Sequence, residues 1–138
     1  MLVTWRCTLA SGFILASVAV FAGQASACAV ARGDRVLLAS QSLDPDVFVW
    51  DSAQRLIEYV QGNFDTEGVL RHTVLAKPGT PAIATDCRGA AAKAEYAKSD
   101  VDLVGIKLTK GPNRGRYGWV VADDVRRLDG KPVTVSTP

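Results

Sequence analysis

The sequence has little of what most metal and catalytic sites require. It contains one histidine, His72, and three cysteines, Cys7, Cys28 and Cys87. A structural zinc site needs four clustered nitrogen or sulfur ligands, so these few, scattered residues argue against zinc. No segment has the regularly spaced oxygen ligands of a calcium-binding loop. We therefore expect neither a metal nor another cofactor.

Hydrolase motifs are also missing, because neither a GxSxG nor an HExxH pattern occurs. We interpret His72 as a structural residue. The alternative is that it acts as a general base, with Asp65 or Glu67 close to it in the sequence. That alternative would make the protein a small hydrolase of the cell envelope.

Two pairs of carboxylates, Asp100 with Asp102 and Asp123 with Asp124, are the other candidates for chemistry. Neighbouring residues on a turn point apart, whereas a catalytic pair faces across a cleft. We interpret Asp123 as the cap of a short helical turn and Asp124 as a solvated side chain. These residues therefore favour a protein without enzymatic activity.

Long apolar runs are absent as well. The apolar stretch at residues 13–22 is shorter than the roughly 20 residues that a membrane-spanning helix needs. It follows a single cation, Arg6, and precedes the small residues Ala25, Ser26 and Ala27. This pattern predicts a secretory signal peptide over residues 1–27, cleaved after Ala27. An uncleaved membrane anchor is the alternative.

The chain that remains after cleavage has almost no net charge. It keeps 15 of the 16 Lys and Arg residues and all 14 Asp and Glu residues. General nucleic-acid binding depends on many cations that neutralise phosphates, so we expect no nucleic-acid partner. We expect an exported protein, periplasmic or secreted, with no membrane span after cleavage.

The two cysteines of the mature chain, Cys28 and Cys87, have three interpretations. In an oxidising compartment two cysteines usually form one disulfide. On the chain-entropy model, closing the loop between them would stabilise the fold by roughly 4 kcal/mol. A cysteine at the first mature position is also where bacterial lipoproteins are acylated, which would anchor the protein to the outer membrane. Two free thiols are the third possibility, and position alone leaves all three open.

With 138 residues, 48% of them hydrophobic, the chain has room for one globular domain, expected over residues 28–128 with a fraying tail over 129–138. We predict strands at residues 35–40 and 47–50, separated by a turn at 44–46. Strands at 69–77 and 82–87, joined by a turn at 78–81, predict a hairpin. Residues 88–100 fit a short helical turn or a mobile loop equally well.

One convincing helix is predicted over residues 52–63. Apolar residues recur at helical spacing on one face, at Ala53, Leu56, Ile57, Val60 and Phe64. Asp51 occupies the expected N-cap position with Gln54 three residues later, as in a capping box. Gly62 is placed to end the helix. We expect its apolar face to pack on a β-barrel or to cover one open end.

The stretch from residue 102 to 128 organises the chain. Two apolar runs, at 103–108 and 117–121, flank a polar turn and predict a second hairpin. Val104, Ile106 and Leu108 lie on one face of the first run. A single helical turn at 122–125 and a last short strand at 126–128 are expected to follow.

This order of elements resembles the C-terminal half of bacterial Src-homology-3-like barrels. The matching residues are Gly111, Pro112, Arg114, Gly115, Gly118, Trp119, Val120 and the turn at 122–125. The resemblance implies a mainly β fold, a small Src-homology-3-like barrel with one helix inserted between early strands. Bacterial members are often linked to the cell wall. The acidic and aromatic loop that binds proline-rich peptides in eukaryotic relatives is not recognised, so that activity is not carried over.

Cations gather on the 110–119 hairpin, whose turn holds Lys110 and Arg114 between Lys107 and Arg116. With exposed backbone N–H groups they form a candidate site for an anionic group. The alternative is a solvated tip whose charges prevent aggregation. Of the aromatic residues Trp50, Tyr59, Tyr117 and Trp119, we expect most to lie in the core.

The resulting hypothesis is an exported binding module that docks a peptide, glycan or protein of the cell envelope or cell wall. The predicted binding residues are Lys110, Arg114, Arg116, Tyr117 and Trp119. Two alternatives remain, the small hydrolase that uses His72 and a purely structural or inhibitory envelope protein. An enzyme needs His72 to meet a carboxylate in a concave site, whereas a binding module needs an exposed aromatic or basic patch.

Overall fold

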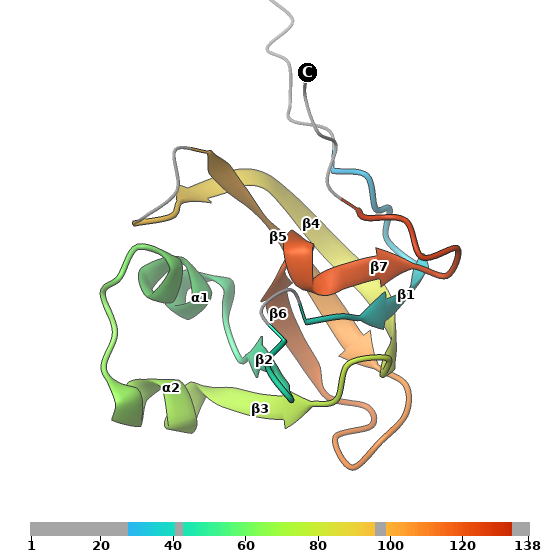
Figure 1. The fold of residues 1–138 in the computed structure, drawn as a ribbon, viewed down its shortest axis with the longest axis horizontal. Coiled ribbons are helices and arrows are strands. Elements are labelled where there is room, and N and C mark those ends of the chain that lie inside the picture. The colour runs from blue at the N-terminus through green and yellow to red at the C-terminus, as the bar shows by residue number, and fades with distance from the viewer. Residues whose placement is uncertain (1–27, 41–42, 96–98, 134–138) are drawn as a thin grey trace, which may run out of the picture.

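In the described part of the chain, seven strands form one antiparallel sheet that curls into a half-barrel, and two helices lie at its side (Figure 1). The computed structural model describes residues 28–40, 43–95 and 99–133. The predicted signal peptide and residues 134–138 of the predicted tail lie outside the described residues. The strand order is β3-β2-β6-β5-β4-β1-β7. The prediction of a mainly β fold is confirmed.

The elements follow one another along the chain with short connections. They are β1 (Arg35–Leu38), β2 (Val47–Trp50), α1 (Ala53–Val60), α2 (Thr66–His72), β3 (Thr73–Ala76), β4 (Pro81–Lys93), β5 (Asp100–Leu108), β6 (Tyr117–Val121), the 3₁₀ turn η1 (Ala122–Asp124) and β7 (Val125–Arg127).

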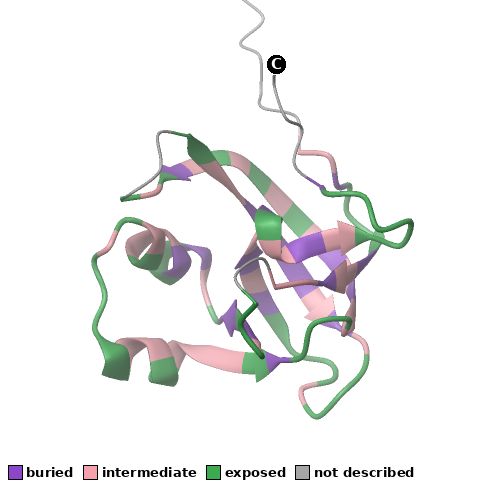
Figure 2. Cartoon of the chain, viewed as in Figure 1, coloured by how far each residue is buried: buried purple, intermediate pink, exposed green. Residues whose placement is uncertain are grey.

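Apolar clusters cover both faces of the sheet. The larger lies inside the curl, where Val104 and Ile106 of β5 meet Val120 of β6 and residues of every other strand. The smaller lies on the opposite face, where Leu103 packs against Leu56 of α1. The middle of β5 is buried over Leu103–Ile106 (Figure 2). Successive strand residues point to opposite faces, so β5 contributes to both clusters. The helix predicted between early strands therefore covers the outer face of the sheet, beside β6.

The hairpin predicted from the apolar runs at 103–108 and 117–121 is confirmed. β5 pairs with β6 from Leu103 opposite Val121 to Lys107 opposite Tyr117, and η1 and β7 follow as expected. Gly118 is required by close packing, because a Cβ at this position would lie 2.4 Å from Cγ1 of Val49. β2 can therefore approach β6 there.

α1 is confirmed, but its cap differs from the prediction. Ser52 is the N-cap, and its hydroxyl accepts a hydrogen bond from the backbone N–H of Arg55 at 3.2 Å. Asp51 instead contacts His72, and the side chain of Gln54 donates to Glu58. Serine is as good a cap as aspartate, so the competing contact with His72 decides the position. Gly62, with φ of +81°, follows the helix as expected.

A second helix, α2, occupies residues that were predicted to begin a strand. The side chain of Asp65 caps it by accepting from the N–H of Gly68. Glu67 and Arg71 form an ion pair one turn apart. These local contacts outweigh the β-propensity of Val69, so the strand begins only at Thr73. The prediction of a single helix was wrong.

The predicted hairpin between residues 69–77 and 82–87 was also wrong. β3 pairs with β2, whereas β4 pairs with β1 and β5. The intervening turn is tied to β1, because the N–H of Gly79 donates to the carbonyl of Leu38 at 2.7 Å. The turn therefore connects β3, at one edge of the sheet, to β4, which lies between β5 and β1. β4 then continues to Lys93, so residues 88–93 are strand and neither helical turn nor loop.

A disulfide joins Cys28 to Cys87 on β4, with Cα atoms 6.0 Å apart. It confirms the interpretation of these cysteines as a disulfide pair. The start of the predicted fraying tail is also packed in the structure: Pro132 forms a bridge with Arg126, and Val133 is 2% exposed. Neither helix in the described part of the chain has the length and hydropathy to cross a bilayer.

Candidate functional site

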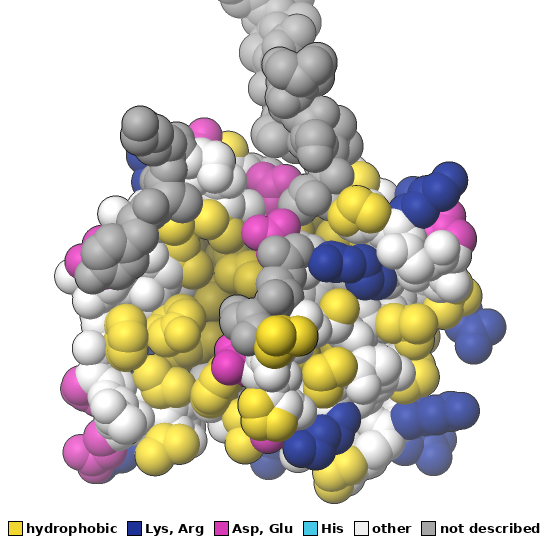
Figure 3. Space-filling view, viewed as in Figure 1, with side chains coloured by type: hydrophobic (Ala, Val, Ile, Leu, Met, Phe, Trp, Pro, Cys, Tyr) yellow, Lys and Arg dark blue, Asp and Glu magenta, His cyan; other side chains and the backbone are white. Residues whose placement is uncertain are grey.

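A groove opens where strands β2 and β6 diverge. The two strands share one register pair, Trp50 opposite Trp119. Beyond this pair α1 and η1 border the gap, which forms a cavity of about 320 Å³. In the space-filling view hydrophobic side chains line a hollow beside α1, with acidic side chains at its edge (Figure 3). The lining residues are Ser40, Asp44, Asp46, Val47, Phe48, Trp50, Leu56, Tyr59, Val121, Asp123 and Asp124.

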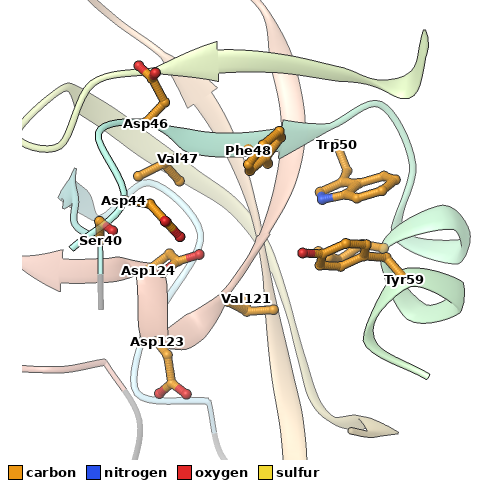
Figure 4. A pocket seen from close by; sticks show the side chains of 11 residues that line it. Ser40, Asp44, Asp46, Val47, Phe48, Trp50, Tyr59, Val121, Asp123 and Asp124 are labelled. Atoms are coloured by element: carbon orange, nitrogen blue, oxygen red, sulfur yellow. The ribbon is translucent and has the colours of Figure 1, made fainter. Parts of the chain in front are cut away.

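Aromatic side chains form one end of this groove. The rings of Trp50 and Tyr59 lie 4.9 Å apart and are tilted by 40° (Figure 4). Trp50 is 4% exposed and is held by the core, whereas Tyr59 and Phe48 are 37% and 38% exposed. Phe64 continues the cluster, with its ring 4.6 Å from that of Tyr59. A fixed indole with two accessible rings beside it is a surface that ligands can cover.

Carboxylates gather at the other end of the groove. Asp44 and Asp46 come from the segment before β2, and Asp123 and Asp124 from η1 (Figure 4). Asp46 pairs with Lys77, with 2.7 Å between oxygen and nitrogen. Among the residues that the structure describes, neither Asp44 nor Asp123 takes part in an ion pair. The groove thus has an aromatic end and an acidic end.

The predicted hairpin residues do not form one patch. Lys110 and Arg114 are exposed at the tip, where Gly111 and Gly115 have positive φ values. Tyr117 is 64% exposed and lies under the ammonium of Lys107, 5.1 Å from ring centroid to Nζ.

Trp119 belongs to different surroundings from the tip. It is half-buried on the outer face of the sheet, where it packs against the cluster that contains Leu56 and Leu103. The guanidinium of Arg88 covers its ring. The expectation that this aromatic residue lies in the core is therefore met in part.

His72 meets a carboxylate, although not one of those expected. Its Nδ1 lies 2.7 Å from an oxygen of Asp51, across the β2–β3 pair. Arg116 and Tyr117 border the same small cavity of about 110 Å³. Its described lining has no serine or cysteine, and the Thr73 hydroxyl donates to a backbone carbonyl. Among the described residues, the arrangement therefore has an acid–base pair without a serine or cysteine beside it.

Asp65 and Glu67 have structural contacts of their own at α2, as described above. Asp102 accepts a hydrogen bond from the N–H of Ala90, 2.7 Å away. Asp123 does not cap η1, where no side chain provides a cap. Within residues 28–40, 43–95 and 99–133, no group of three or more His, Cys, Asp and Glu residues could hold a metal ion.

Sequence reasoning missed the groove. Asp44 and Asp46 were interpreted only as turn residues, and Asp123 only as a cap. The available signal was the alternation of β2, which places Phe48 and Trp50 on one face. Their meeting with η1, more than 70 residues later, depends on the curl of the sheet and has no local pattern.

Comparisons with protein-family models, curated proteins and solved structures found no match to this chain.

Proposed function

We propose that this protein is an exported binding module, built on a Src-homology-3-like barrel, whose ligand docks in the groove between β2 and η1. The supporting observation is the groove itself, with accessible rings of Phe48 and Tyr59 beside the buried indole of Trp50. Concave surfaces with a few polar groups around an aromatic wall are where proteins usually bind ligands. We also propose that the ligand belongs to the cell envelope or the cell wall.

Binding is favoured over catalysis by the separation of the candidate groups. The described lining of the groove contains no histidine or cysteine. The His72–Asp51 pair lines a different cavity, whose described lining lacks a serine or cysteine. A catalytic site needs its base and nucleophile within hydrogen-bonding reach of one another. A ligand that only docks has no such requirement.

Export is supported by the disulfide and by the predicted signal peptide. A disulfide persists in an oxidising compartment, such as the periplasm or the outside of the cell. The bond between Cys28 and Cys87 also uses the sulfur that a lipid anchor at Cys28 would need. We therefore propose a periplasmic or secreted protein, with lipidation as the alternative for molecules that lack the bond.

The groove is tested by capture of envelope components on tagged protein expressed from residue 28. Tyr59→Ala removes an accessible ring from the groove. Leu70→Ala is the matched control, because Leu70 is an exposed apolar residue outside the groove lining. We expect Tyr59→Ala to reduce capture from envelope extract or cell-wall sacculi while the control retains it. Equal capture by both variants, with unchanged melting temperatures, would refute the groove as the docking site.

The hairpin tip is a second candidate surface. Lys110, Arg114 and Arg116 are exposed around a glycine-containing turn, which suits an anionic group. It shares no lining residue with the groove. The two surfaces therefore make separate predictions about which variants lose capture.

A further inference from the structure

We infer that the groove accepts an extended peptide segment and places a lysine or arginine side chain of that segment between its aromatic and acidic ends. This inference rests on the proposed function, because it names the ligand class of the same groove. Three observations support it, namely the charge of the lining, the size and shape of the cavity, and the backbone groups that border it.

The described side chains that line the groove carry only negative charge. Among the described residues, four carboxylates border the groove and no lysine or arginine does, although the whole chain has slightly more cations than anions. Asp46 is partly compensated by Lys77. Asp44 and Asp123 are exposed and have no ion-pair partner in the described part of the chain. Charge complementarity therefore points to a cationic ligand and opposes an anionic one.

The cavity is large enough to hold one long side chain. Its volume of about 320 Å³ is at the small end of ligand pockets, which run from roughly 300 to 1,000 Å³. Lysine and arginine combine an apolar stem with a charged head, and such side chains lie along apolar surfaces with the head outside. Here the stem would contact Phe48 and Val121, and the head would reach the acidic end of the groove. The ring of Tyr59 offers a further cation–π contact.

The backbone beside the cavity favours an extended peptide. The N–H of Asp51 donates to the carbonyl of His72, just before β3. Because backbone groups alternate along a strand, those of Phe48 and Trp50 point away from β3 and toward β6. On β6, the alternate residues from Arg116 onward direct their backbone groups to β5. The backbone N–H and C=O groups of Trp119 and Val121 therefore point toward β2.

Two positions beyond the Trp50–Trp119 pair, Phe48 would lie opposite Val121, but the described strands form no pair there. Both residues line the cavity. Their backbone donors and acceptors therefore border a gap that an extended peptide can follow.

The test uses end-blocked, fluorescein-labelled hexapeptides of valine and threonine with one central residue. That residue is lysine, norleucine or glutamate, and binding is measured by fluorescence anisotropy. The groove variant combines Asp44→Asn with Asp123→Asn. Its matched control combines Asp100→Asn with Asp129→Asn, which removes two charges outside the groove lining. N-acetyl-lysine amide serves as a competitor that has the side chain without the extended backbone.

We expect the lysine peptide to bind more tightly than the norleucine and glutamate peptides. The groove variant should weaken its binding about tenfold, and the control should weaken it less than twofold. Added salt should lower the affinity of the wild type more than that of the groove variant. Equal affinity of the lysine and norleucine peptides, or no loss in the groove variant, would overturn the inference. Equally strong competition by N-acetyl-lysine amide would overturn the assignment of an extended peptide.

The outcomes separate this inference from the proposed function. If no hexapeptide binds while Tyr59→Ala still reduces envelope capture, the ligand class is wrong and the groove remains the docking site. If Tyr59→Ala leaves capture unchanged, the proposed function itself fails. A lysine peptide that binds the groove variant as well as the wild type would show contact outside the acidic end, and would also overturn the inference.

Discussion

The guanidinium of Arg88 lies over the indole ring of Trp119, with 4.5 Å between its Cζ atom and the ring centroid. Arg88 comes from β4 and Trp119 from β6, so the contact spans the intervening strand β5. On its other side Trp119 is the one register partner of Trp50 in the β2–β6 pair. The tryptophan therefore joins the central hairpin to the strand that borders the groove.

Trp119→Ala should lower the free energy of unfolding by about 3 kcal/mol, the low end for loss of a large ring, because the side chain is half-buried. Arg88→Ala should lower it by about 0.5–1 kcal/mol, as expected for an exposed cation–π contact. Urea denaturation followed by circular dichroism measures both. Similar losses in the two variants would mean that the ring contributes no more than its contact with the arginine.

The disulfide should stabilise the fold by constraining the unfolded chain. Cys28 and Cys87 are separated by 59 positions, and the chain-entropy model assigns such a loop about 4 kcal/mol. We expect Cys28→Ser and Cys87→Ser each to lower the melting temperature as much as the double variant does. Intact mass after alkylation should show blocked thiols until the protein is reduced. An added mass of acyl chains on Cys28 would instead support the lipoprotein alternative.

The N-cap of α1 distinguishes the structure from the sequence-based expectation. Ser52→Ala should cost about 1 kcal/mol, because it leaves the N–H of Arg55 without its side-chain acceptor. Gln54→Ala should have a smaller effect, since the glutamine only reaches Glu58 on the helix surface. Chemical denaturation of the two variants gives the comparison. A larger loss for Gln54→Ala would restore the capping box predicted from the sequence.

The packing of α1 is tested by Leu56→Asp. Leu56 is 2% exposed, so this substitution buries a carboxylate without a partner and should destabilise the fold by several kcal/mol. Gln54→Ala, on the solvent side, is the matched control. If both variants unfold at the same urea concentration as the wild type, the helix does not pack as the structure shows.

The parts of the fold that were predictable have local patterns. Two apolar runs around a glycine-containing turn predict β5 and β6. The apolar stripe of Ala53, Leu56, Ile57 and Val60 predicts α1. β2 is recognisable as a short apolar run after a proline turn. In each case residues within about ten positions determine the element, so a single sequence contains the information.

The parts that failed depend on distant contacts or on competing local ones. β4 continues beyond Cys87 because β5 pairs with it as far as Lys93 opposite Asp100, a partnership that alanine-rich residues do not signal. His72 finds Asp51 from 21 positions away because β2 and β3 pair. The groove combines segments from β2, α1 and η1, so its aromatic and acidic ends appear only when the sheet curls.

The last prediction concerns the cations of the hairpin tip. Arg114 and Arg116 are exposed on a turn between β5 and β6, so replacing both with alanine should change the free energy of unfolding by less than about 0.5 kcal/mol. If the tip holds an anionic group of a partner, this double variant should capture less of the envelope component. Capture by the wild type should then fall as salt is added.

The matched comparison for the tip is the groove variant that combines Asp44→Asn with Asp123→Asn. An anionic ligand at the tip loses affinity only when the arginines are removed, whereas a cationic peptide loses affinity only when the carboxylates are. The remaining outcome is that the arginine variant leaves capture unchanged while Tyr59→Ala reduces it. The tip would then be a solvated turn whose charges keep the sheet from aggregating, and the groove alone would carry the function.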